Sequence, residues 1–109
     1  MRRKMRKNLL YLAQMLQENG EGSYAAIIED AISGSDRERD AILVSNELWG
    51  GAGSIADQAG LVDVRRTDGT RKIQHALIQL GSEQIRMGKI NPRTKTWVEV
   101  FKKWEDAGI

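Results

Sequence analysis

The chain lacks several residue types on which whole classes of protein depend. It has no cysteine, which excludes disulfide bridges and thiolate metal ligands and fits a reducing cytoplasm. His75 is the only histidine, so no metal-ligand spacing can be built around it. No apolar run approaches the roughly 20 residues of a membrane span. We therefore expect a cytoplasmic protein with no cofactor and no metal ion.

The length predicts one domain. A chain of 109 residues is long enough to bury a sizeable core without a covalent staple. Residues 1–8 begin with five cations and no acid, and we interpret them as a basic N-terminal leader of a single helical domain at residues 9–109. The leader resembles a signal peptide only superficially, because Gln14, Gln17 and Glu18 interrupt the apolar part and no small-residue cleavage site follows.

What the chain does have is glycine, 11 residues in all, with three of them between Trp49 and Ser54. Glycine is favoured where φ is positive or where another segment approaches the backbone closely, so this stretch predicts a tight, specified corner. Ser54 stands where an N-cap belongs, with Asp57 three residues later as in a capping box. Free N–H groups of the helix that follows could attract an anion, although a corner that simply closes over Trp49 is the favoured interpretation.

Helical spacing of apolar residues and helix start and stop signals predict an all-α fold of five or six helices. The glycine corner joins two of them. Gly81 interrupts the longest helix, which indicates that another helix crosses closely there. The run Ala41–Val44 could form a strand, but the capping box before it favours a helix. The expected helices cover residues 3 to about 19, Ser23 to Ser33, Ser35 through Leu43 toward Ser45, Ile55 to about Leu61, Thr67 or Asp68 to Gly88, and a terminal helix with Asn91 as N-cap and Pro92 as its first residue.

Charge is distributed unevenly along the chain. Residues 18–47 contain eight acidic side chains and two arginines, whereas residues 65–103 contain ten basic and three acidic side chains. The formal net charge of +2 hides this polarity. The electric field of an unevenly charged protein steers its partners, and a basic face suggests a nucleic-acid partner. The plainest alternative is that both charged faces are merely solvated, or that the acidic helices shield the basic one within the fold.

Two stretches of the sequence match catalytic or cofactor-binding motifs only in part. Gly51–Ala56 fits the dinucleotide pattern G-x-G-x-x-A, but no strand precedes it directly and Gly60 ends the following helix early. Ala52–Ala56 imitates a nucleophile elbow and lacks the strand that strains such a serine. His75 has no recognisable partner for acid–base work, so we expect no enzyme.

The terminal segment offers binding anchors. Trp97, Phe101 and Trp104 have the spacing of a buried helix face, and any ring that stays exposed would mark an interface. Arg93, beside Thr94, could reach carbonyl groups of the glycine corner or a carboxylate of a partner. These features define the candidate binding residues: Trp49, Gly51, Gly53, Ser54, Asp57, Arg93, Thr94 and Trp97.

The segments Trp49–Asp57 and Asn91–Thr94, with Trp97, resemble a group of small uncharacterised bacterial proteins that share a G-G-x-G-S-x-x-D core. The resemblance covers roughly residues 9 to 105 and leaves out the basic leader. It implies no established activity. Some members resemble, in size and helical content, the immunity proteins that neutralise bacterial toxins.

The sequence thus predicts a non-enzymatic, protein-binding module, an immunity-like or antitoxin-like inhibitor that occludes its partner. Its acidic region, Glu18 to Glu47, would contact the partner if that partner were a basic nuclease. Two alternatives stay open: a nucleic-acid-binding accessory protein that uses the leader and residues 65–103, and a binder of a small ligand or anion at the glycine corner.

Overall fold

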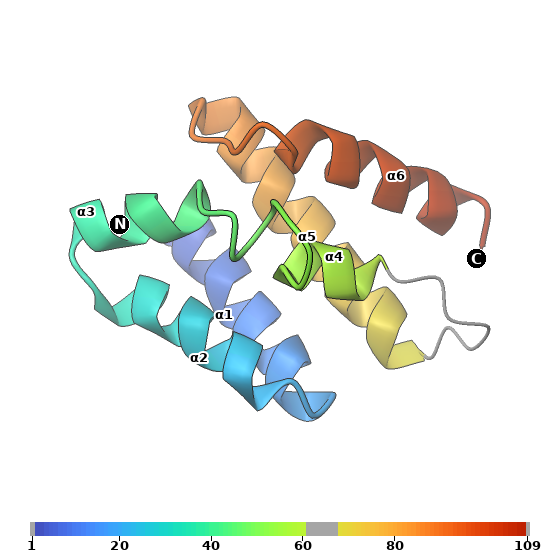
Figure 1. Ribbon diagram of the computed structural model, residues 1–109, viewed down its shortest axis with the longest axis horizontal. Coiled ribbons are helices and arrows are strands. Elements are labelled where there is room, and N and C mark those ends of the chain that lie inside the picture. Colours follow the sequence, from blue (N-terminus) through green and yellow to red (C-terminus); the bar gives the residue numbers. More distant parts are fainter. Residues whose placement is uncertain (1, 61–67, 109) are drawn as a thin grey trace.

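The computed structural model describes residues 2–60 and 68–108, and within them it contains six helices and no strand. The helices are α1 (Arg3–Glu18), α2 (Gly22–Ser33), α3 (Asp36–Leu43), α4 (Ile55–Ala59), α5 (Asp68–Met87) and α6 (Thr94–Asp106) (Figure 1). The predicted all-α class is therefore confirmed. Leu61 and Thr67, the predicted limits of two helices, lie outside the described residues.

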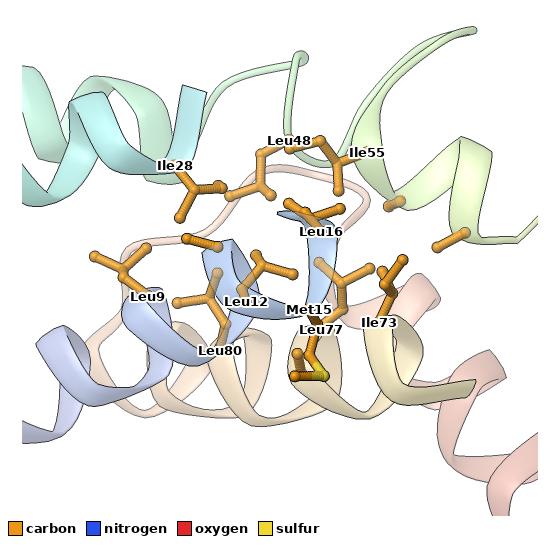
Figure 2. Packing of buried hydrophobic residues seen from close by; sticks show 14 of the residues in the cluster. Leu9, Leu12, Met15, Leu16, Ile28, Leu48, Ile55, Ile73, Leu77 and Leu80 are labelled. Atoms are coloured by element: carbon orange, nitrogen blue, oxygen red, sulfur yellow. The ribbon is translucent and has the colours of Figure 1, made fainter. Parts of the chain in front are cut away.

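Helix α1 is the centre of the core. It packs against α2 on one side and α5 on the other, and α6 crosses α5 (Figures 1 and 2). Side chains at helical spacing on α1 meet Ile28 of α2 and apolar side chains of α5. The buried apolar residues of these three helices include Leu9, Leu12, Leu16, Ile28, Ile73, Leu77 and Leu80.

The predicted leader does not form a separate segment. Helix α1 starts at Arg3, and Met5 is buried in the core together with Asn8, whose amide donates to the carbonyl of Gln79 on α5 at 3.3 Å. The same helix continues without a break through buried Leu12, two turns after Met5. The cations of residues 2–7 are thus held on a folded surface, because core residues alternate with them along the helix.

Two predicted caps are wrong. Ser23 lies inside α2, which begins at Gly22 without a side-chain cap. Asn91 does not cap α6: its carboxamide oxygen accepts from the N–H of Arg93 in a local turn, and the helix begins at Thr94. A short polar side chain can bond in a turn as readily as at a cap. Ser35, by contrast, forms the predicted capping box with Glu38.

None of the helices in the described part of the chain combines the length and the apolar character that a membrane span requires.

Candidate functional site

The glycine corner has the backbone that its sequence predicts. Gly51 has a φ of 90° and Gly53 a φ of 83°, both in the left-handed region that favours glycine. An added Cβ would meet no neighbour at either position. These two glycines are therefore required for the backbone conformation and not for close packing.

The polar side chains of the corner are used within it. The hydroxyl of Ser54 accepts from the N–H of Asp57 at 3.0 Å, as predicted for the cap of α4. The Asp57 carboxylate accepts from the N–H of Gly53 at 3.0 Å, one residue before the place that a capping box gives it. The Tyr24 hydroxyl donates to the carbonyl of Gly53 at 2.8 Å and ties the corner to α2. These bonds favour a structural role for Ser54 and Asp57 over anion binding.

Trp49 is fully buried beneath the corner, and a glutamine holds it there. Its indole N–H donates to the side-chain oxygen of Gln84 at 3.0 Å. The Gln84 amide donates in turn to the carbonyls of Leu43 at 2.7 Å and Lys89 at 2.9 Å. Sequence reasoning missed Gln84. The available signal was a polar residue on the apolar stripe of the long helix, four positions after Leu80.

Asn91 links the turn before α6 to the segment that leads into the glycine corner. Its amide donates to the carbonyl of Val44 at 2.9 Å and to the side-chain oxygen of Asn46 at 3.0 Å. Its own N–H donates to the buried hydroxyl of Thr94 at 3.0 Å. The turn before α6 is thereby fixed against the segment that enters the corner.

Two of the predicted binding residues do not join this cluster. Arg93 is exposed, and its guanidinium makes no hydrogen bond or ion pair with any residue that the structure describes, so the predicted contact with the corner carbonyls is not formed. Trp97 is half-buried, with its ring stacked on Phe101 at a centroid distance of 5.3 Å. It packs over Gly60, where an added Cβ would clash with the ring. Neither side chain completes a pocket at the corner.

His75 lies on the surface. Its Nδ1 is 2.9 Å from a carboxylate oxygen of Glu105, which links α5 to α6, and its Nε2 is 3.1 Å from the amide of Gln79. Over residues 2–60 and 68–108, no three histidine or carboxylate side chains converge to hold a metal ion. His75 thus serves as a polar link between α5 and α6.

Exposed acids without a paired cation lie on α2 and at the residue before it. Glu21, Glu29 and Asp30 are exposed, and none of them forms an ion pair with another described residue. The acids of α3 are engaged: Asp36 with Arg39 and Asp40 with Lys89, each at N–O distances below 3 Å. The hydrogen bond from Arg39 holds the pKa of Asp36 below its ordinary value. Exposed negative charge without a paired cation thus lies on α2, at Glu29 and Asp30, and just before it at Glu21; Glu18 and Glu47 add to it at the limits of the acidic region.

A buried carboxylate lies between α1 and α5. The Glu83 side chain is only 1% exposed and accepts from the guanidinium of Arg86 on its own helix. Lys4 of α1 approaches the same carboxylate at 3.5 Å. The hydrogen bond from Arg86 holds the pKa of Glu83 below its ordinary value, with the charges of both cations acting in the same direction. Glu83 therefore neutralises part of the basic surface between these helices.

The two glycines with positive φ give a direct test of the corner. We expect Gly53→Val to lower the free energy of unfolding by about 2 kcal/mol, because a β-branched residue is strained at this φ. Ser54→Ala should cost about 1 kcal/mol through the lost cap. Urea denaturation measures both. Ala52→Val is the matched control, since Ala52 is exposed and has no positive φ, and a Gly53→Val variant as stable as this control would contradict the interpretation.

Comparison of the chain with protein-family models, with curated proteins and with solved structures finds no match in any of the three. Any functional inference therefore rests on the chemistry of this chain's own residues.

Proposed function

We propose that the chain is a non-enzymatic, protein-binding module that inhibits a basic partner by occluding its surface, as an immunity or antitoxin protein does. The observation that carries the proposal is the unpaired negative charge of α2 and of Glu21 just before it. From Asn8 to Asp36 the sequence contains no lysine or arginine, so no cation of this segment offsets Glu21, Glu29 and Asp30. Within the predicted contact region, Glu18 to Glu47, we propose that the exposed side of α2 and the residue before it make the contact.

The shape of α2 suits such a contact. Small exposed side chains, Ser23, Ala26 and Ser33, lie among the carboxylates and leave room for the long side chains of a partner. The helix is fixed to α1 by buried Ala25, Ile28 and Ala31, so its carboxylates need little ordering when they bind. Electrostatic complementarity raises the association rate and excludes partners of the same charge.

The proposed partner is a basic protein such as a toxin nuclease, and the proposed site of action is the cytoplasm. Occlusion needs no catalytic group on this chain. It needs only an exposed, preorganised surface whose charge matches that of the partner's active face.

A variant with two neutralised carboxylates tests the proposal, with any basic proteins encoded by adjacent genes as candidate partners. We expect E29Q/D30N to slow association with the cognate partner about tenfold at low ionic strength, with most of the effect lost at high salt. Stopped-flow fluorescence measures the rate. Both residues are exposed, so the melting temperature should change little.

The matched control is E99Q/D106N, which removes two exposed carboxylates from α6. An equal effect of the two double variants would show that only net charge matters and would contradict a contact on α2. The proposal as a whole fails if none of the basic neighbours binds the unaltered chain.

A further inference from the structure

A second surface, independent of α2, lies between α1 and α5. The two helices run antiparallel there: Lys4 faces Glu83, Asn8 faces Gln79, and Tyr11 faces His75. Side chains of both helices line two adjoining hollows of about 740 and 580 Å³, which share Lys7 and Gln79 as lining residues. We call this surface the α1–α5 groove. Its lining on α1 includes Arg3, Lys4, Arg6, Lys7, Leu10 and Tyr11.

The groove carries positive charge that no described residue neutralises. Glu83 engages Lys4 and Arg86. Arg3, Arg6 and Lys7 are exposed and form no ion pair within the described residues. The larger hollow has these three cations in its lining and no acidic side chain. An occupant of this hollow should therefore be anionic.

The same hollow also has an apolar part. Leu10 is 46% exposed and is one of two large apolar side chains that the described structure leaves open to solvent. It lies one turn after Arg6 and Lys7, and Tyr11 lies beside it with its ring in an edge contact with His75 at a centroid distance of 6.5 Å. The same hollow can therefore bind an anionic group through its cations and an apolar group through Leu10 and Tyr11.

We propose that the α1–α5 groove docks an acidic protein segment that carries an apolar anchor. The anchor covers Leu10 and the exposed part of Tyr11, and carboxylates of the segment pair with Arg6 and Lys7. Burial of apolar surface between partners adds binding free energy, and arginine beside an aromatic ring is a common interface anchor.

A nucleic-acid backbone would use only half of this surface. Phosphates would pair with Arg3, Arg6 and Lys7, but Leu10 offers them nothing, and a phosphodiester chain would cover it without apolar contact. The exposed part of the Tyr11 ring is open to a stacked base as well as to a peptide side chain, so Leu10 is the residue that separates the two occupants. The exposed leucine therefore favours a protein segment over the nucleic-acid alternative.

The test uses synthetic probes and fluorescence anisotropy. The first probe is a labelled peptide of about 14 residues that a side-chain lactam holds in a helix roughly 21 Å long, with leucines on one face and glutamates and glutamines on the others. The second has serine in place of each leucine, and the third is a labelled single-stranded oligonucleotide. We expect the leucine peptide to bind and the serine peptide to bind at least tenfold more weakly.

Variants of the groove separate the contribution of its apolar side chain from that of its cations. Leu10→Gln should weaken binding of the leucine peptide about tenfold, and R6Q/K7Q should weaken it further and remove most of its salt dependence between about 50 and 200 mM. Val44→Gln, at the other exposed apolar residue, and R93Q/K95Q, at two exposed cations near the start of α6, are the matched controls and should bind normally. All replaced side chains are exposed, and melting temperatures verify that each variant folds.

Two results would overturn the proposal. One is the absence of peptide binding at millimolar concentration. The other is oligonucleotide binding that R6Q/K7Q removes and Leu10→Gln leaves unchanged, which would assign the groove to nucleic acid. Neither result bears on α2, so the proposed inhibitory function is tested separately.

Discussion

Gln84→Ala is expected to lower the free energy of unfolding by about 3 kcal/mol, since it leaves two buried polar groups and one partly buried carbonyl without their partners. The side chain of Gln84 accepts from the indole of Trp49 and donates to the carbonyls of Leu43 and Lys89. Gln84 is fully buried, so water cannot replace these bonds without entering the core. Urea denaturation followed by tryptophan fluorescence measures the effect.

Gln79→Ala is the control on the same helix. Gln79 is exposed, and its replacement should change stability by no more than about 0.5 kcal/mol. A double-mutant cycle with Trp49→Phe isolates the indole bond and should give a coupling of about 1 kcal/mol. If Gln84→Ala is as stable as Gln79→Ala, the hydrogen-bond network does not stabilise the corner.

Gly81→Val should be comparably severe, at about 3 kcal/mol, because the site is already closely packed. A Cβ at Gly81 would clash with Val98 of α6 and lie 2.9 Å from the ring of Trp49. The helices would have to separate, and this would also disturb the buried indole. Gly81→Ala should cost less, because the clash is partly offset by a gain in helix propensity of about 1 kcal/mol.

Two further variants check the cause. Gly22→Ala puts the same methyl group where its nearest neighbour, the Gln17 side chain, is 3.9 Å away, so it should not destabilise the fold. Val98→Ala in the Gly81→Ala background removes one clashing group and should recover part of the loss. A Gly81→Val protein that unfolds at the same urea concentration as the unaltered chain would contradict the close crossing.

Sequence signals predicted helix ends correctly where the residue had a single possible local role. The Ser35 capping box, the Ser54 cap and the positive φ of Gly53 depend on neighbours within four residues, and all are present. Gly81 predicted a helix crossing because glycine is costly inside a helix without a packing reason, and α6 crosses there. The Ser23 cap failed because α2 already begins at Gly22, and the Asn91 cap failed because its side chain bonds in a local turn instead.

The candidate surfaces were harder to predict because they depend on pairing between distant segments. Whether the cations of residues 2–7 form a tail or a surface is decided by Met5 and Asn8, whose burial needs α5 beside them. The partners of Gln84 are 35 and 41 residues away along the chain for two of its three bonds. Helical periodicity shows which side of a helix is buried but not which helix covers it.

The glycine corner is held by residues far away in the sequence, and this affects the order in which parts of the chain fold. Helices α1 and α2 adjoin in sequence, so they can pair after closing only a short loop. The corner, although continuous in sequence, is held by Gln84 and Asn91, which reach it only when the second half of the chain has docked. Contacts of high sequence separation form slowly because a long loop must close first. We therefore expect the α1–α2 hairpin to nucleate folding and the corner to be among the last parts to acquire its native shape.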